Sequence, residues 1–268
     1  MDPKSATHIL YHARCDDGFG AAWAAWKALG DAAVYIPVSH GHPPPEELAP
    51  DSRVVIVDFS YARPTLLELK ERCADLFVLD HHKTAREELA GLPFTRFDMD
   101  RSGAHLAWDF WHPGSPLPDL LAYVEDKDLW RFALPDSKEV AAALRSYPMD
   151  FKLWDEFTVD LLKREGATLL RLQEQLVWSA CERARWAEVG GHRVPIVNAT
   201  DFRSEIANRL CDLHPQAPFA AAYYDDESGN RNWSLRSVGD FDVSKLARSL
   251  GGGGHKNSAG FSEGREKT

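Results

Sequence analysis

Apolar segments that alternate with helical patterns along the first third of the chain restrict the fold more than any other feature. The segments RVVIVDF and LFVLD are apolar through most of their length. Strands of this kind are buried on both faces, which is typical of a parallel sheet covered by helices. We therefore predict an α/β fold whose N-terminal domain contains a Rossmann-like parallel sheet. Its strands are predicted at 8–12, 33–38, 53–59 and 76–80, with helices at 18–29 and 63–74.

The rest of the chain divides into a helical stretch and a second α/β block. Residues 151–184 predict one or two long helices, with Gly166 as the place where an interruption is expected. We predict an N-terminal domain at 1–150, a helical linker at 151–186 and a smaller α/β domain at 187–268. The remaining helices are predicted at 103–112, 118–130, 140–147, 204–213 and 243–250, and the remaining strands at 192–199, 217–224 and 231–237.

Composition and charge argue against several classes of protein. Of the 268 residues, 44% are hydrophobic, which is enough to build a core, and no apolar run is long enough for a membrane span. The first residues lack the apolar stretch of a signal peptide, and the four cysteines lack disulfide or zinc spacing. We therefore expect a cytoplasmic protein with reduced thiols. A formal charge of −10 argues against stable binding to long duplex nucleic acid.

Acidic and imidazole side chains follow three of the predicted strands. His12 ends the first strand, Asp58 lies at the end of the third, and Asp80, His81 and His82 follow the fourth. The ligand crevice of an open α/β sheet lies outside the carboxyl ends of its strands. These side chains are therefore expected to meet at one edge of the sheet.

Carboxylates and imidazoles in this combination suit Mn²⁺, Fe²⁺ or Mg²⁺ better than a closed structural zinc site. Two such ions can share one carboxylate and act together on a phosphoryl group. Asp58 is the candidate for that bridge, because it lies between the other strand ends. An ordinary role is the alternative for each residue alone: Asp16 and Asp17 stand just before a helix, where aspartate caps well.

The segment LDHHKTA resembles the signature of the DHH phosphoesterase superfamily. YHARCDDG resembles the first motif of that superfamily, VDF the second and VEDKDLW the fourth, and they occur in the expected order. The superfamily includes exonucleases, oligoribonucleases of the NrnA and NrnB type, dinucleotide phosphodiesterases and inorganic pyrophosphatases. The resemblance covers nearly the whole chain and implies a catalytic DHH domain at 1–150.

The resemblance also implies roles for individual residues. Asp58 would bridge two ions, His82 would face the substrate phosphate, and Asp80 would orient a histidine. Asp128 is an alternative to Asp126 in the fourth motif. The implied metal ligands are His12, Asp17, Asp58, His81 and Asp126, and the implied catalytic residues are His82 and Asp80.

The first motif departs from the family pattern. Two aspartates separated by one residue usually precede its glycine, but the first of these positions is Cys15. Asp16 could replace the missing aspartate as a metal ligand by a shift of register. Otherwise one metal position is weakened or a thiolate takes part, which would favour a softer ion.

The segment GGGGHKNSAGF resembles the glycine-rich loop of the DHH-associated domain, which binds nucleotide in that family. The resemblance implies that residues 187–268 bind substrate through Gly252, Gly253, Gly254 and His255. We expect HKNSAG to open a helix whose N-terminus favours phosphate. Arg236 on a nearby predicted strand is a further phosphate partner. Ser102 either donates to phosphate or caps the helix that follows it.

These features together predict a Mn²⁺-dependent phosphodiesterase that hydrolyses short oligonucleotides or linear dinucleotides to nucleoside monophosphates. Two Mn²⁺ ions are expected, with Mg²⁺ or Fe²⁺ as alternatives, and cyclic dinucleotides stay open as substrates. One alternative is a phosphatase of small phosphomonoesters such as adenosine bisphosphate. The other is a nucleotide- or RNA-binding module without catalysis. The expected partner is a short single strand, not a membrane, and a homodimer is left open.

Overall fold

The computed structural model describes residues 1–39 and 41–264. Its backbone divides into two compact units, Met1–Leu170 and Arg171–Thr268. The division falls inside one continuous helix, α8 (Val159–Cys181), which follows the short helix α7 (Phe151–Glu156). A separate helical linker at 151–186 stays a prediction. None of the helices in the described part of the chain is both long and apolar enough to cross a membrane.

The first unit contains the parallel sheet that the sequence predicts. Five strands lie in the order β2-β1-β3-β4-β5, and all neighbouring pairs are parallel. Strand β1 pairs with β2 on one side and β3 on the other, and Leu10 lies between Ile36 and Ile56. The strands are β1 (His8–His12), β2 (Val34–Val38), β3 (Arg53–Val57), β4 (Asp75–Asp80) and β5 (Thr95–Phe97).

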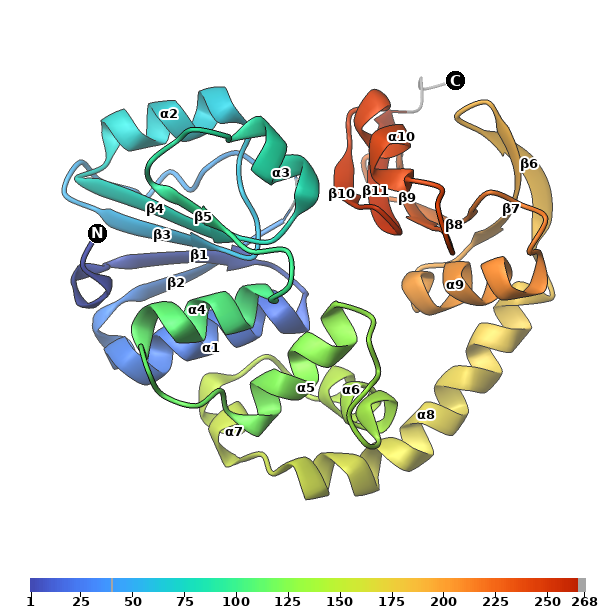
Figure 1. Cartoon of the computed structure of the whole chain (residues 1–268), viewed down its shortest axis with the longest axis horizontal. Coiled ribbons are helices and arrows are strands. Elements are labelled where there is room, and N and C mark those ends of the chain that lie inside the picture. Colours follow the sequence, from blue (N-terminus) through green and yellow to red (C-terminus); the bar gives the residue numbers. More distant parts are fainter. Residues whose placement is uncertain (40, 265–268) are drawn as a thin grey trace. The chain divides into compact units, whose positions relative to one another are not determined.

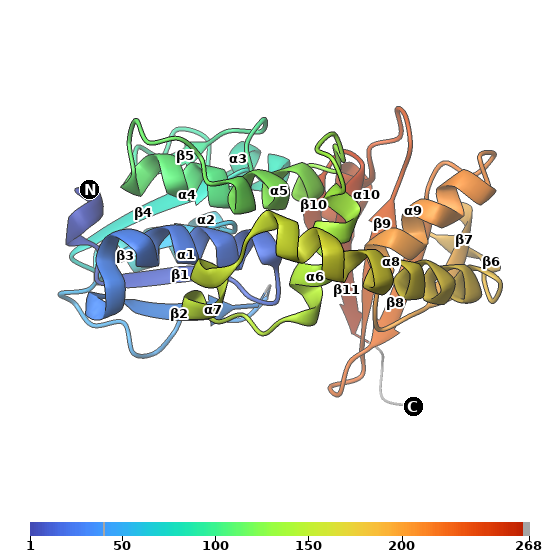
Figure 2. The same ribbon diagram turned by 90° about the horizontal axis from the view of Figure 1, so that it is seen from below.

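Helices cover both faces of this sheet (Figure 1). Ile9, Val55 and Leu79 pack in one cluster with α1 and α4, which lie side by side in both views (Figure 2). Leu10 and Ile56 point to the opposite face, where α2 packs. Strands with both faces buried account for the continuous apolar runs in the sequence. The helices are α1 (Asp16–Leu29), α2 (Arg63–Arg72), α3 (Lys83–Glu88) and α4 (Gly103–Trp111), with short 3₁₀ turns at Pro3–Ser5 and Gly30–Ala32.

Small residues let the helices of the first unit approach one another closely. A Cβ atom on Gly20 of α1 would lie 3.1 Å from the Cβ of Ala104 on α4. On Gly166 it would lie 1.8 Å from the carbonyl oxygen of Glu139. Gly166 therefore permits the contact between α8 and α6 and does not interrupt the helix. The remaining helices here are α5 (Asp119–Asp128) and α6 (Ser137–Ser146).

The second unit contains a mixed sheet of six strands in the order β10-β11-β9-β8-β7-β6. Only β7 and β8 are parallel among its neighbouring pairs in the described residues. Helix α9 packs with Val197 and Ala222 on one face, and α10 packs with Val194 and Leu235 on the other. The elements are β6 (Arg185–Val189), β7 (His192–Asn198), α9 (Arg203–Leu213), β8 (Ala220–Asp225), β9 (Asn230–Arg236), α10 (Val243–Ser249), β10 (Gly253–His255) and β11 (Ser258–Gly264).

The glycine-rich segment forms a β-hairpin, so the expectation of a helix there is wrong. Strand β11 pairs with β9 along its whole length and with β10 through a tight turn. A Cβ on Gly252 would lie 2.0 Å from the carbonyl oxygen of Gly260. Gly254 has φ of +138°, a conformation that other residues rarely adopt. The glycines are thus needed because the paired strands approach one another closely. The local sequence pattern, which predicted a helix start, does not reveal this strand pairing.

Candidate metal centre

The predicted residues lie at the carboxyl ends of three parallel strands, at one edge of the first sheet. His12 is the last residue of β1, Asp58 directly follows β3, and His81 directly follows β4. Asp58 has φ of +61°, a left-handed conformation that is uncommon for residues other than glycine, although aspartate tolerates it. Such backbone strain is concentrated at functional sites. Here it turns the chain so that the carboxylate of Asp58 faces its neighbours.

Asp58 lies at the centre of the cluster. Its Oδ2 is 3.3 Å from Nδ1 of His12, and its Oδ1 is 3.1 Å from Nε2 of His81. Within the first unit, three groups of candidate ligands have their atoms within 4.8 Å of one another, and each of these groups includes Asp58. This sharing supports the prediction of a bridging carboxylate. The groups are His12 with Cys15 and Asp58, Asp17 with Asp58 and His81, and Asp80 with Asp58 and His82.

Asp17 connects the start of α1 to the start of α4. Its carboxylate accepts hydrogen bonds from the backbone N–H groups of Gly103 at 2.6 Å and Ala104 at 2.9 Å. Its Oδ2 also lies 3.6 Å from Nε2 of His81. A Cβ on Gly103 would lie 2.6 Å from the Cβ of Asp58. Gly103, the first residue of α4, therefore lets the start of this helix approach the cluster, a requirement that the sequence does not reveal.

Asp80 holds the two histidines that follow it. Its fully buried carboxylate accepts hydrogen bonds from the backbone N–H groups of His81 at 2.7 Å and His82 at 3.2 Å. Nδ1 of His82 lies 2.7 Å from the same oxygen. An ionised carboxylate only accepts hydrogen bonds, so Nδ1 of His82 carries the proton. Burial by itself would raise the pKa of Asp80, but His82 and His81 hold it below its ordinary value.

The cluster concentrates negative charge in a place with little water. Burial, with the neighbouring carboxylates of Asp58 and Asp128, raises the pKa of Asp17 well above its ordinary value. Burial by itself would lower the pKa of His81, but Asp58, Asp128 and Asp17 raise it well above its ordinary value. The carboxylates repel one another and attract protons onto neighbouring groups. A compact positive charge is therefore favoured at this position.

The fourth motif contributes Asp128 to the cluster, and Asp126 lies outside it. Oδ2 of Asp128 is 3.5 Å from Nε2 of His81. The carboxylate of Asp126 accepts hydrogen bonds from the backbone N–H groups of Ala133 at 2.9 Å and Leu134 at 3.1 Å. Asp126 thus stabilises the turn after α5, and of the two aspartates that the sequence left open, Asp128 is the one that lies beside His81.

Asp16 also lies outside the three ligand groups, although the sequence made it a candidate. Its Oδ2 lies 3.5 Å from Nζ of Lys127, which neutralises its charge. Cys15, the other alternative, lies beside His12 and Asp58. The shift of register that would make Asp16 a ligand is therefore not what the structure shows.

Ser102 caps helix α4, which was the ordinary alternative for this residue. Its Oγ accepts a hydrogen bond from the backbone N–H of His105, and the side chain is fully buried. The backbone N–H of Ser102 donates to Glu125 at 3.0 Å, and Glu125 also lies 2.7 Å from Nδ1 of His105. The sequence did not single out Glu125 and His105, which hold the start of α4 against the cluster.

In the second unit, strand register brings the predicted substrate-binding residues together. Arg236 on β9 lies opposite Ser258 on β11, and Ser258 lies opposite His255 on β10. The guanidinium of Arg236 donates to Oγ of Ser204 and to the carbonyl oxygen of Leu235. Gly252, Gly253 and Gly254 form the adjoining part of the hairpin.

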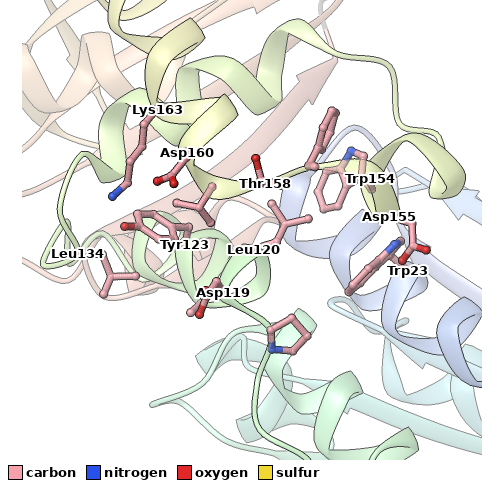
Figure 3. Close-up of a pocket in the computed structure, with 14 residues that line it drawn as sticks. Trp23, Asp119, Leu120, Tyr123, Leu134, Trp154, Asp155, Thr158, Asp160 and Lys163 are labelled. Atoms are coloured by element: carbon pink, nitrogen blue, oxygen red, sulfur yellow. The ribbon is translucent and has the colours of Figure 1, made fainter.

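A separate cavity of about 720 Å³ lies in the first unit, among α1, α5 and the start of α8 (Figure 3). In Figure 3, Tyr123 and Lys163 lie on one side of it and Trp23 and Trp154 on the other. Its lining contains none of the predicted site residues. The cavity is therefore distinct from the metal centre.

Comparison with known proteins finds two curated relatives and no matching family model. The chain is 31% identical over 282 residues to the uncharacterized protein R106 of Acanthamoeba polyphaga mimivirus, covering 94% of the chain and 66% of that protein. It is 29% identical over 213 residues to the oligoribonuclease NrnB of Bacillus subtilis strain 168, covering 69% of the chain and 52% of that protein. The chain thus spans less than two thirds of the length of either relative.

The fold also matches solved structures of DHH proteins. The DHH domain of PF0399, a member of the s1p family of ribosomal proteins, has a TM-score of 0.58 at 16% identity, covering 96% of this chain and 83% of that one. The chain shares the fold of this DHH domain. RecJ from Thermus thermophilus, solved with Mn²⁺, has a TM-score of 0.55 at 15% identity, covering 97% of this chain and 50% of that one. At these identities the two structures show the fold alone.

The residues of the cluster at this sheet edge fit a divalent metal. The centre offers carboxylate and imidazole donors, which suit hard and borderline divalent ions. Three of its carboxylates surround Nε2 of His81 within 3.6 Å, and the resulting like-charge repulsion is relieved by a cation. The residues that would hold divalent ions are His12, Asp17, Asp58, His81 and Asp128, with Cys15 beside them.

Proposed function

We propose that the chain is a metal-dependent phosphodiesterase that hydrolyses short oligonucleotides or linear dinucleotides to nucleoside monophosphates. The observation that carries this proposal is the position of Asp58, whose carboxylate is shared by three groups of candidate ligands. The similarity of the chain to the oligoribonuclease NrnB supports short oligonucleotides as the substrate class. We propose Mn²⁺ as the working ion, since carboxylate and imidazole ligands suit it.

Divalent ions at this centre would supply Lewis-acid activation of water and would neutralise phosphate charge. The chain itself provides the positioning. Asp17 holds the start of α4 beside the cluster, and Asp80 holds the ring of His82 through Nδ1. Because Nδ1 is bonded to Asp80, proton exchange with a substrate takes place at Nε2 of His82. We assign His82 the protonation of the leaving oxygen.

The second unit is proposed to bind the nucleoside end of the substrate. Arg236 and His255 lie one strand apart on either side of Ser258, so their donors occupy neighbouring positions of one sheet. Guanidinium and imidazole groups both donate hydrogen bonds to phosphate oxygens. A half-buried arginine that is already bonded to Ser204 is oriented before substrate arrives.

The proposal is tested with the purified chain, Mn²⁺ and a labelled linear dinucleotide. We expect nucleoside monophosphates, no turnover in the presence of a chelator, and a rate that falls as the oligonucleotide becomes longer. The variant His81→Ala is expected to lose hydrolysis, because its ring contacts three carboxylates of the cluster. A control variant, His8→Ala, changes a histidine at the opposite end of β1 and is expected to keep the rate.

Product analysis decides between this reaction and its competitors. Turnover of adenosine bisphosphate but not of dinucleotide would replace the proposal with a phosphomonoesterase. Binding of dinucleotide without turnover under any divalent ion would replace it with a binding module.

A further inference from the structure

We propose that Cys15 is a metal ligand, which acts as a thiolate together with His12 and Asp58 and selects a thiophilic divalent ion at this position. The inference rests on the proposed metal-dependent function and specifies its ligand set. The ion class that fits a thiolate, an imidazole and a carboxylate is Zn²⁺, Co²⁺ or Fe²⁺ in preference to Mg²⁺. The two metal positions that share Asp58 as a ligand would then prefer different ions.

The first observation is the position of the thiol. Cys15 is the N-cap residue of α1, but its side chain makes no capping hydrogen bond. Its sulfur, a ring nitrogen of His12 and a carboxylate oxygen of Asp58 all lie within 4.8 Å of one another. Ligand atoms that share one ion at about 2.0–2.3 Å lie within about 4.6 Å of one another. A small contraction would therefore bring all three into the coordination range of a single ion.

The neighbouring acidic residues do not occupy this place. Asp16 is paired with Lys127 at 3.5 Å. Asp17 accepts the two backbone N–H groups at the start of α4 and faces His81. Successive residues at the start of a helix point about 100° apart, so one turn cannot aim all three side chains at the same point. Cys15 is the residue of this turn that faces His12.

A second observation is the burial of the Asp58 carboxylate. Its Oδ2 is buried and makes no hydrogen bond, and it faces Nδ1 of His12 at 3.3 Å. Asp58 as a whole is 1% exposed. Buried carboxylate oxygens are normally hydrogen-bonded, paired or bound to metal. This oxygen is directed toward the place where Cys15 and His12 converge, which is where a cation would satisfy it.

The other cysteines serve different purposes and supply controls. Cys73 is buried in the apolar cluster beneath α2. The thiol of Cys181 lies 3.8 Å from the carbonyl oxygen of Ile206, and that of Cys211 donates to the carbonyl oxygen of Arg236 at 3.0 Å. None of these three is in a ligand group of the described residues. Cys211→Ser keeps a donor at its position and is therefore the matched control.

The experiment is an anaerobic titration of the metal-free full chain with Co²⁺, followed by absorption spectroscopy. The wild type and Cys211→Ser are expected to show a thiolate-to-Co²⁺ charge-transfer band in the near ultraviolet. Cys15→Ser and Cys15→Asp are expected to lack it, with circular dichroism confirming that each variant is folded. Because Cys15→Asp supplies a harder oxygen ligand, the ratio of Zn²⁺ to Mn²⁺ affinity should fall about tenfold or more.

Two results would overturn the inference. One is a charge-transfer band that persists in Cys15→Ser. The other is a wild-type protein that binds Co²⁺ at both metal positions but shows no charge-transfer band. A parallel assay of dinucleotide hydrolysis separates this outcome from failure of the proposed function. A band without hydrolysis keeps the ligand assignment and refutes the phosphodiesterase. Hydrolysis without a band keeps the phosphodiesterase and refutes the ligand.

Discussion

The two sheets of this protein present their candidate residues in different ways. In the parallel sheet of the first unit, the residues lie beyond the strand ends, and Asp17, Asp58 and His81 are each no more than 1% exposed. In the mixed sheet of the second unit, Arg236 and His255 lie within strands and are half-buried. Burying charge costs free energy unless the charge is compensated, whereas a half-exposed guanidinium costs little.

Under the proposed function, this difference corresponds to a division of work. A buried carboxylate cluster suits a cation held in a fixed geometry, and donors on an accessible strand surface suit contacts that form and break with each substrate molecule. We therefore expect changes in the first unit to remove chemistry and metal affinity, and changes in the second to weaken substrate binding.

The largest expected effect is that of Asp58→Asn. Asparagine tolerates the left-handed backbone at this position, so the fold should be kept while the bridging charge is lost. Removing a residue that only supports a ligand costs about 10- to 100-fold, so loss of a shared ligand should exceed roughly 100-fold in metal affinity and kcat. Calorimetric titration with Mn²⁺ and a dinucleotide assay measure the two quantities.

Asp126→Asn and Asp128→Asn test where the cluster ends. Asp128→Asn is expected to lower metal affinity about tenfold or more, because Asp128 lies 3.5 Å from His81. Asp126→Asn should lower the free energy of unfolding by about 1 kcal/mol through the weakened turn, with kcat nearly unchanged. If the two variants behaved in the opposite way, the fourth motif would act through Asp126.

The next effect is that of Gly103→Ala. The added methyl group would lie 2.6 Å from the Cβ of Asp58, so the start of α4 must move and its bond to Asp17 must lengthen. We expect a folded protein with metal affinity reduced about 10- to 100-fold. Gly264→Ala, whose nearest neighbour in the second unit would be 3.7 Å away, is the control and should change nothing measurable. Equal effects from both glycines would mean that the close approach is unimportant.

The smallest effect concerns substrate binding. His255→Ala should raise KM for a dinucleotide about tenfold and change kcat by less than about twofold, because it removes a hydrogen-bond donor to substrate and leaves the metal centre intact. His214→Ala is the control, since His214 packs against Trp186 on the opposite edge strand of the same sheet. A loss of kcat without a change in KM would give the hairpin a part in the chemistry.

Much of the fold could be predicted because buried strands leave a strong pattern. The apolar runs before Asp58 and Asp80 mark strands covered on both faces, and the five-stranded parallel sheet confirms them. The sequence predicts a helix start where the structure has the hairpin of Gly253–His255 and Ser258–Gly264, because the pairing partner β9 is separated from the hairpin by helix α10. Register between distant strands is a tertiary property, and local composition does not contain it.

For the candidate site, the sequence by itself determined which residue types gather at the strand ends, since parallel strands place their carboxyl ends on one edge. It did not determine which of two nearby candidate residues faces the cluster. Asp128 and Cys15 face the cluster, while Asp126 and Asp16 bond to the turn after α5 and to Lys127. Side chains one residue apart on a helix differ by about 100° in direction and side chains two residues apart by about 200°, so only the packing of α1 and α5 within the first unit decides which of them faces the cluster.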